Sequence, residues 1–156
     1  MGLTSLQAFL RRHRRIALDT SVFIYQLEAN PRYVALTDPI FKWLGQPNHI
    51  GITSTITMTE LLVPAYQGSS EAPEAQVDLF YGLLATYPNL DWIPPNLEVA
   101  DIAARIRAQH RLRTPDALQA ATAVQSHATG LVTNDAIFER VEAFETMVLD
   151  GLLEPE

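Results

Sequence analysis

Five short apolar segments recur along the chain, and segments with helical periodicity separate them. The five segments are residues 15–19, 49–53, 90–93, 131–133 and 147–149. Strands that alternate with helices are typical of an α/β domain with a mostly parallel central sheet. Right-handed crossovers between parallel strands place helices on both faces of such a sheet. The sequence therefore predicts an α/β fold with a helical layer on each side of the sheet.

Helices are expected at 3–11, 20–29, 33–44, 55–62, 73–87, 96–110 and 114–128. Capping chemistry sets several of these boundaries. Asn96 is expected to cap the helix that follows it, and Thr114 before Pro115 is typical of an N-cap and a first helical position. Pro39 lies inside the third helix, where it is expected to bend or restart the helix. The expected helices and the expected strands do not overlap in the sequence.

The length and composition indicate one domain. The chain has 156 residues, and 47% of them are hydrophobic, which is enough to form one globular core. Residues 67–73 form the loop richest in Gly, Ser and Pro, and this loop is too short to link two domains. We therefore expect a single domain over residues 1–156.

Composition also excludes several kinds of function. The chain has no cysteine, so disulfides, thiolate metal sites and a cysteine nucleophile are impossible. The net charge of −7 argues against broad electrostatic adhesion to nucleic acid. No apolar stretch approaches the length of a membrane span, and the N-terminal basic residues follow the apolar run, unlike those of a secretory signal. A cytoplasmic location with no membrane contact is expected.

Four acidic residues stand where a catalytic fold could use them. Asp19 and Asp135 each follow a predicted strand, and sites in open α/β sheets form beyond the carboxyl ends of strands. Glu60 and Asp116 lie within predicted helices. Each acid alone has an ordinary explanation as a helix cap, a partner of a helix dipole or a solvated side chain. Their conjunction is what suggests a site.

Four carboxylates brought together without a basic partner would repel one another unless a cation neutralised them. Hard divalent cations take oxygen ligands, and such an ion can activate water and stabilise charge that develops on a phosphoryl group. The chain has no HExxH, GxSxG, Walker or GxGxxG motif to support another chemistry. A divalent-metal site is therefore the interpretation that the acids favour.

Eight of the eleven basic residues fall in two arginine clusters, at 11–15 and 105–113. Each cluster could simply be a solvated helix face. The second, however, runs through Arg111 and Arg113 directly into Asp116, and arginine can bind phosphate with two parallel hydrogen bonds. Arg113 is thus a candidate for holding a phosphate beside the acids.

The segments around the four acids resemble a known family. LDTSVFIY, TMTELL, TPDALQAATA and LVTNDAIFERV are similar, in order and spacing, to the four acidic motifs of PIN domains, and most closely to those of VapC-type toxin ribonucleases of prokaryotic toxin–antitoxin pairs. The resemblance spans about residues 16–152. It implies a three-layer α/β/α PIN-like fold and a Mg²⁺- or Mn²⁺-dependent endoribonuclease that hydrolyses RNA phosphodiester bonds. It also implies a homodimer and a cognate antitoxin as partners.

The resemblance assigns roles by position. Asp19, Glu60, Asp116 and Asp135 would be the catalytic, metal-binding carboxylates. The residues expected at the edge of the site or in support of it are Thr20, Ser21, Arg113, Thr133 and Asn134. Many members have a further Asp just before the Phe of the last motif, where this chain has Ile137. The resemblance thus implies four carboxylates in this chain, without that fifth one.

Other functions remain open at this point. The chain could be a housekeeping PIN nuclease that acts in RNA processing or on DNA, or a non-catalytic PIN-like domain that binds RNA or a protein. Loss of one acid would favour the non-catalytic alternative, and here all four are present. A phosphorylated receiver-like domain normally has a late lysine after a strand. Lys42 is the only lysine of the chain, which argues against that class.

Overall fold

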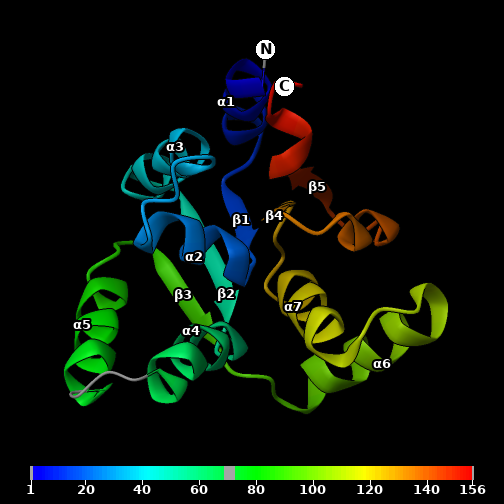
Figure 1. The fold of residues 1–156 in the computed structure, drawn as a ribbon. Coiled ribbons are helices and arrows are strands. Elements are labelled where there is room, and N and C mark those ends of the chain that lie inside the picture. The colour runs from blue at the N-terminus through cyan, green and yellow to red at the C-terminus, as the bar shows by residue number, and fades with distance from the viewer. Residues whose placement is uncertain (1, 69–72, 156) are drawn as a thin grey trace.

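The computed structural model describes residues 2–68 and 73–155, so residues 69–72 of the expected loop lie outside the described part. A parallel five-stranded sheet forms the centre of the molecule (Figure 1). Its strands are β1 Arg15–Leu18, β2 Ile50–Ser54, β3 Leu90–Ile93, β4 Gly130–Thr133 and β5 Glu145–Val148. The spatial order is β3-β2-β1-β4-β5, and every neighbouring pair is parallel. The predicted strands and their parallel arrangement are confirmed.

Helices connect the strands. They are α1 Gly2–Arg12, α2 Thr20–Leu27, α3 Val34–Leu44, α4 Ile56–Gln67, α5 Pro73–Ala85, α6 Leu97–His110 and α7 Thr114–Gln125, with the 3-10 helices η1 Ala136–Arg140 and η2 Leu149–Leu152. Asn96 caps α6 as expected, because its side chain accepts a hydrogen bond of 2.9 Å from the Val99 N–H. Within the described residues, none of these helices is both long and apolar enough to cross a membrane.

Several helix boundaries differ from the sequence-based expectation, and α2, α5 and α7 end two or three residues earlier than expected. Helix α3 runs through Pro39 without a restart, and α4 continues past Pro64 to Gln67. Proline removes only one helical hydrogen bond, and the buried Leu62 and Ala65 pack α4 against Val77 of α5. Thr114 is the first residue of α7 and not its N-cap, since Arg113 holds the extended N-cap position.

Two apolar clusters, one on each face of the sheet, make the structure three-layered. On one face, Leu6, Val22, Phe23 and Ile40 from α1, α2 and α3 are among the buried side chains. On the other face lie buried residues of α6 and α7, among them Ala103, Ile106, Ala117, Ala120 and Ala121. The small side chains of α7 allow it to lie close to α6 and to β2, with which it makes many contacts. The three-layer α/β/α fold is therefore confirmed.

The strand order reverses direction between β1 and β4. The chain runs from β1 outward to β2 and β3, and then returns through α6 and α7 to place β4 on the other side of β1. Leu18, the last residue of β1, pairs with Val132 of β4. In open parallel sheets, the crevice outside the carboxyl ends of the strands at such a reversal is where ligands bind.

Candidate active site

Asp19 lies at this reversal, directly after β1. Its N–H donates a hydrogen bond of 3.0 Å to the Val132 carbonyl, which extends the pairing of β1 with β4 by one residue. Asp19 holds the N-cap position of α2, yet its side chain makes no capping hydrogen bond. Its carboxylate instead accepts a hydrogen bond of 2.8 Å from the Thr133 hydroxyl. Helix capping therefore does not explain this acid.

The surroundings of Asp19 disfavour its negative charge. Burial raises its pKa from 3.8 to about 6, against the opposing effects of the Thr133 hydroxyl and the Thr20 N–H. The charges of Glu60 and Asp116 raise the pKa further. Three acids from segments distant in the sequence thus lie close enough to repel one another at the end of β1.

Glu60 lies on the second turn of α4. Burial, and then the charge of Asp116, raise its pKa, while the Thr20 hydroxyl and the Arg113 guanidinium oppose the rise. Glu60 therefore interacts with residues from both α2 and α7. The sequence predicted a group of four acids, and three of them, Asp19, Glu60 and Asp116, interact electrostatically in the structure.

Asp116 has a basic partner, so the expectation of carboxylates without one is wrong. The Arg113 Nε donates a hydrogen bond of 3.2 Å to Asp116 Oδ2. The two residues are three positions apart at the start of α7, so their side chains lie on one face of that first turn. The Asp116 side chain is only 15% exposed, whereas that of Arg113 is 77% exposed. Arg113 therefore partly neutralises the site from the solvent side.

Asp135 lies at the edge of this group. Its carboxylate accepts a hydrogen bond of 3.0 Å from the Ile137 N–H, so it caps η1. Its own N–H donates to the Thr133 hydroxyl at 3.0 Å, and that hydroxyl donates to Asp19. Asp135 is thus connected to Asp19 through Thr133, while its carboxylate makes no hydrogen bond or ion pair with the other three acids among the described residues.

Ser21 and Asn134 join α2 to the loop after β4. The Ser21 hydroxyl accepts a hydrogen bond of 3.2 Å from the Asn134 N–H. The Asn134 amide donates to the hydroxyls of Tyr25 and Tyr33 at 2.9 and 3.2 Å, and its oxygen accepts from the Asp150 N–H at 2.8 Å. This network fixes the backbone on which Asp135 lies.

Some residues of this region were missed in the sequence. Tyr25 and Tyr33 stack with ring centroids 4.0 Å apart, and Tyr33 donates a hydrogen bond of 2.5 Å to Asp150. Nothing in the sequence near Tyr25 connects it to a residue after β4. Buried Thr57 and Gln119 were also missed. Their one signal was polar character within otherwise apolar helical segments.

The oxygen ligands that the acids offer suit a hard divalent cation, but the acids do not form a complete coordination shell. Among residues 2–68 and 73–155, no three His, Asp or Glu side chains form a ready-made metal site. The available donors are carboxylate oxygens whose mutual repulsion an added positive charge would relieve. Mg²⁺ keeps several waters and is usually held by one or two protein carboxylates, so a closed cage is not required.

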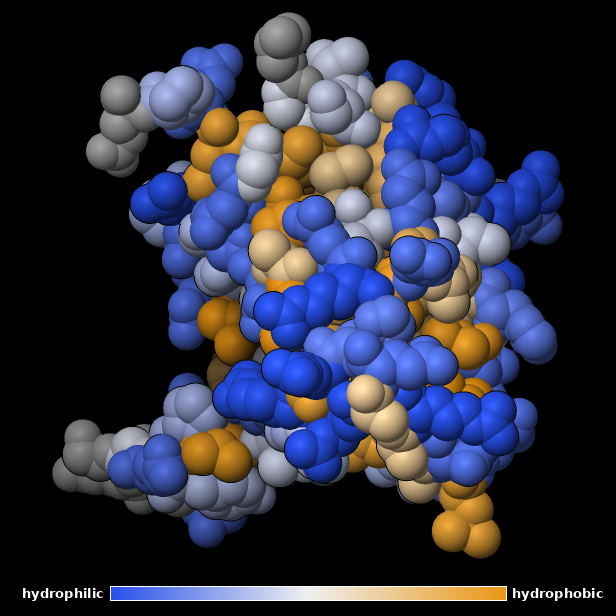
Figure 2. Space-filling view, turned by 90° about the vertical axis from the view of Figure 1, so that its right-hand side faces the viewer, coloured by the Kyte–Doolittle hydropathy of each residue, from blue (hydrophilic) through white to orange (hydrophobic). Residues whose placement is uncertain are grey.

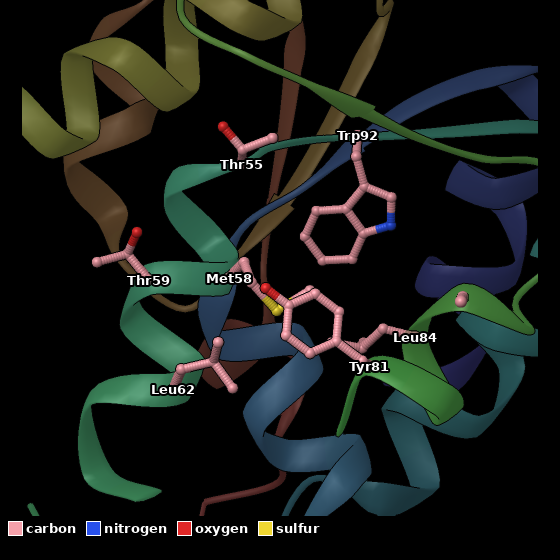
Figure 3. A pocket seen from close by; sticks show the side chains of 8 residues that line it. Thr55, Met58, Thr59, Leu62, Tyr81, Leu84 and Trp92 are labelled. Atoms are coloured by element: carbon pink, nitrogen blue, oxygen red, sulfur yellow. The ribbon is translucent and has the colours of Figure 1, made fainter. Parts of the chain in front are cut away.

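A cavity of about 560 Å³ lies next to this group, between α4, α5 and β3. Met58, Tyr81, Leu84 and Trp92 gather around it (Figure 3). Its lining has no Asp, Glu or His side chain and therefore offers no carboxylate or imidazole for a metal ion or for proton transfer. The cavity is therefore an apolar neighbour of the acidic group and not the place of its chemistry.

Most arginines of the second cluster have local structural partners. Arg105 forms an ion pair of 2.9 Å with Asp101, and Arg107 donates to the Leu112 carbonyl at 3.0 Å. Arg111 ends α6 in the left-handed conformation, with φ of 58°. The face of the molecule on the side of α6 is predominantly hydrophilic (Figure 2). In this cluster, Arg113 is the arginine with a recorded contact to the candidate acids.

The fold and the acidic group define a PIN domain. Residues 16–143 match the PIN domain family, and the chain belongs to it. A search of curated proteins gave no significant match.

Solved structures with a similar fold agree with this assignment. DNA-bound VapBC from Salmonella typhimurium is 23% identical, with 86% of this chain and 98% of that chain covered and a TM-score of 0.66. FitAcB from Neisseria gonorrhoeae is 25% identical, with coverage of 84% and 95% and a TM-score of 0.62. VapBC-5 from Mycobacterium tuberculosis, described as a member of the VapBC family of toxin-antitoxin systems, is 23% identical, with coverage of 86% and 98% and a TM-score of 0.59.

Proposed function

We propose that this chain is a divalent-metal-dependent endoribonuclease of the VapC type, the toxin of a toxin–antitoxin pair. The observation that most supports this function is that Asp19, Glu60 and Asp116 meet beyond the end of β1. There the charges of Glu60 and Asp116 raise the pKa of Asp19, and the charge of Asp116 raises the pKa of Glu60. Membership of the PIN domain family and the similarity to VapBC structures also support it. The reaction would be hydrolysis of an RNA phosphodiester bond.

In this proposal Asp19, Glu60, Asp116 and Asp135 hold Mg²⁺ or Mn²⁺. The bound ion supplies water activation and neutralises charge that develops on the phosphate. Thr133 keeps Asp19 oriented through its hydrogen bond to Oδ2. The exposed Arg113 is placed to bind an RNA phosphate beside Asp116 with the guanidinium nitrogens that the ion pair leaves free.

The remaining site residues support the acids. Thr20 is buried beside Asp19, and Ser21 and Asn134 join the ends of β1 and β4 through their hydrogen bond. The proposed roles are therefore ion binding for the four acids, phosphate binding for Arg113, and positioning for Thr20, Ser21, Thr133 and Asn134.

The proposed partners follow from the same similarity. VapBC-5 is a toxin-antitoxin system, and we extend that arrangement to this chain as a cognate antitoxin that blocks the site. A homodimer is proposed on the family resemblance. Co-expression with the product of a neighbouring gene, followed by co-purification and mass measurement of the complex in solution, tests both partners.

Cleavage of RNA by the purified chain tests the enzyme. RNA should be cut in Mg²⁺ or Mn²⁺ and left intact in EDTA, and an Asp19→Asn, Asp116→Asn double variant should be inactive. Asp101→Asn is a matched control, since Asp101 is also a helical acid paired with an arginine but lies on α6. Cleavage by the double variant, or cleavage that EDTA leaves unchanged, would sink the proposal.

A non-catalytic PIN-like role is the second candidate. The absence of a ready-made metal site among the described residues and the ion pair of Arg113 with Asp116 favour it. A chain that neither binds Mn²⁺ at millimolar concentration nor cleaves RNA would establish this alternative. Cleavage without growth arrest on expression would instead indicate a housekeeping nuclease.

A further inference from the structure

Four buried polar side chains meet beneath the acidic group. They come from four elements and are Thr20 of α2, Thr53 of β2, Thr57 of α4 and Gln119 of α7. All four are less than 5% exposed. Polar groups buried this deeply are costly unless hydrogen-bonded, so a network of them specifies how its elements are placed.

Thr57 is the centre of this network, and its hydroxyl contacts the other three side chains. The Thr53 hydroxyl donates its single hydrogen to the Leu18 carbonyl at 2.9 Å, so Thr57 must donate across the 2.8 Å contact between the two threonines. The Thr57 oxygen then accepts from the Gln119 amide at 2.7 Å, and the Thr20 hydroxyl lies within hydrogen-bonding distance of it at 3.2 Å. A hydroxyl has one hydrogen, and that of Thr20 is shared between Thr57 and the Glu60 carboxylate.

Gln119 joins α7 to the end of β2. Its amide nitrogen donates to Thr57 at 2.7 Å and more distantly to the Thr20 oxygen at 3.5 Å. Its amide oxygen accepts from the Ser54 N–H at 3.4 Å. Thr122 is the other buried polar residue of α7, but its hydroxyl donates to the Leu118 carbonyl within the helix, so the bonds to Thr57 and Ser54 depend on Gln119.

Each member of the hub Thr20–Thr57–Gln119 lies one position or one turn from an acid. Thr20 follows Asp19 directly. Thr57 precedes Glu60 by three residues on α4, and Gln119 follows Asp116 by three residues on α7. Residues three apart on a helix lie on the same face, so the hub joins the same three helix turns that present the acids.

We infer that Gln119 is a positioning residue, which acts through Thr57 and Thr20 to set the separation of the Asp19, Glu60 and Asp116 carboxylates. The inference rests on the proposed function in one respect, that these acids hold a divalent cation. Residues that orient metal ligands commonly change metal affinity or activity by about 10- to 100-fold when they are replaced.

The first test replaces the amide and keeps the volume. Gln119→Met should weaken Mn²⁺ binding by about tenfold, measured by isothermal titration, and should lower kcat more than it changes KM for RNA. Gln125→Met is the matched control on the same helix, because the Gln125 amide bonds to Glu98 on α6 and does not reach the hub. The control should bind Mn²⁺ as the wild-type chain does.

The second test changes the Thr57 hydroxyl at the centre of the network. Thr57→Val keeps the shape and removes the hydrogen bonds, whereas Thr57→Ser keeps the hydroxyl. The valine variant should lose Mn²⁺ affinity and the serine variant should retain it. If Thr57 had a purely structural role, its variants would differ from wild type in melting temperature. Thr57→Val and Thr57→Ser would then have the same affinity for Mn²⁺.

A crystal structure of Gln119→Met decides the inference independently of metal binding. The expected result is a changed separation of the Glu60 and Asp116 carboxylates. Carboxylates that keep their positions, or Mn²⁺ affinity within about twofold of wild type in the folded variant, would overturn the inference. If the wild-type chain binds no Mn²⁺, the proposed function fails, and the carboxylate positions in the variant still decide the role of Gln119.

Discussion

Replacing Asp19 by Asn should stabilise the metal-free chain at neutral pH while it abolishes activity. The structure raises the pKa of the Asp19 carboxyl from 3.8 to about 6, chiefly by burial. The charged form is therefore less favourable in the folded chain than in the unfolded chain. An Asn side chain removes this penalty and still offers an oxygen to the Thr133 hydroxyl.

The size of the effect follows from the pKa. A rise from 3.8 to about 6 corresponds to about 3 kcal/mol of lost stability, at 1.36 kcal/mol for each pKa unit. Because Asp19 retains partial solvent exposure, we expect about 1–3 kcal/mol of this to be recovered. In a chain of this length, that gain corresponds to roughly 3–10 °C in melting temperature.

The stability gained by Asp19→Asn should decrease as the pH falls. The penalty is complete above the folded pKa of about 6 and disappears below the unfolded value of 3.8. Differential scanning fluorimetry in EDTA should therefore find Asp19→Asn more stable than wild type at neutral pH, with the difference lost as the pH falls toward 4. Added Mg²⁺ should stabilise wild type and not the variant, because only wild type keeps the ligand.

Two results would refute this reasoning. One is an Asp19→Asn variant that is no more stable than wild type in EDTA at neutral pH. The other is a gain of the same size at neutral and acidic pH, which would have a cause other than charge burial. Asp101→Asn is the control, since an exposed acid should change stability by no more than about 0.5 kcal/mol.

Three further variants test other parts of the structure. Arg113→Gln should raise KM for RNA severalfold and change stability by less than about 1 kcal/mol, since its ion pair is largely exposed; unchanged RNA binding by filter assay would refute phosphate binding. Thr133→Val should lower kcat at least about tenfold, because the buried hydroxyl that orients Asp19 is lost; full activity would contradict that role. The Arg12 guanidinium holds the pKa of Glu145 below 4.5, so wild type should lose stability as pH falls through that lowered pKa, and Glu145→Gln should be less acid-sensitive in pH-dependent unfolding; equal acid sensitivity of the two chains would be the contrary result.

The sheet could be predicted because its signals are local. Apolar runs, Gly and Pro boundaries and the capping residue Asn96 are all visible within a few positions of each element. The parallel direction of the strands and the placement of Asp19 and Asp135 after their strands followed from general rules for α/β sheets, whereas the strand order was not predicted. Helix α4 was predicted too short because its residues beyond Pro64 are stabilised by burial, which depends on the fold.

The contacts between side chains could not be predicted in the same way. The bond between Gln119 and Thr57 joins residues 62 positions apart, and the bond between Tyr33 and Asp150 spans 117 positions. Such contacts depend on how helices pack and which rotamers result, and the sequence alone does not specify either. The ion pair between Arg113 and Asp116 is local, and its i, i+3 spacing was available in the sequence.

The central claim is that the acids beyond β1 bind a divalent cation for catalysis. Anomalous diffraction from a crystal of the wild-type chain soaked in MnCl₂ tests it most directly, with an Asp19→Asn, Asp116→Asn crystal as control. The account predicts a manganese peak among the carboxylates of Asp19, Glu60 and Asp116 in wild type and no such peak in the double variant. A wild-type crystal with no peak there, or one with manganese bound only elsewhere, would contradict it.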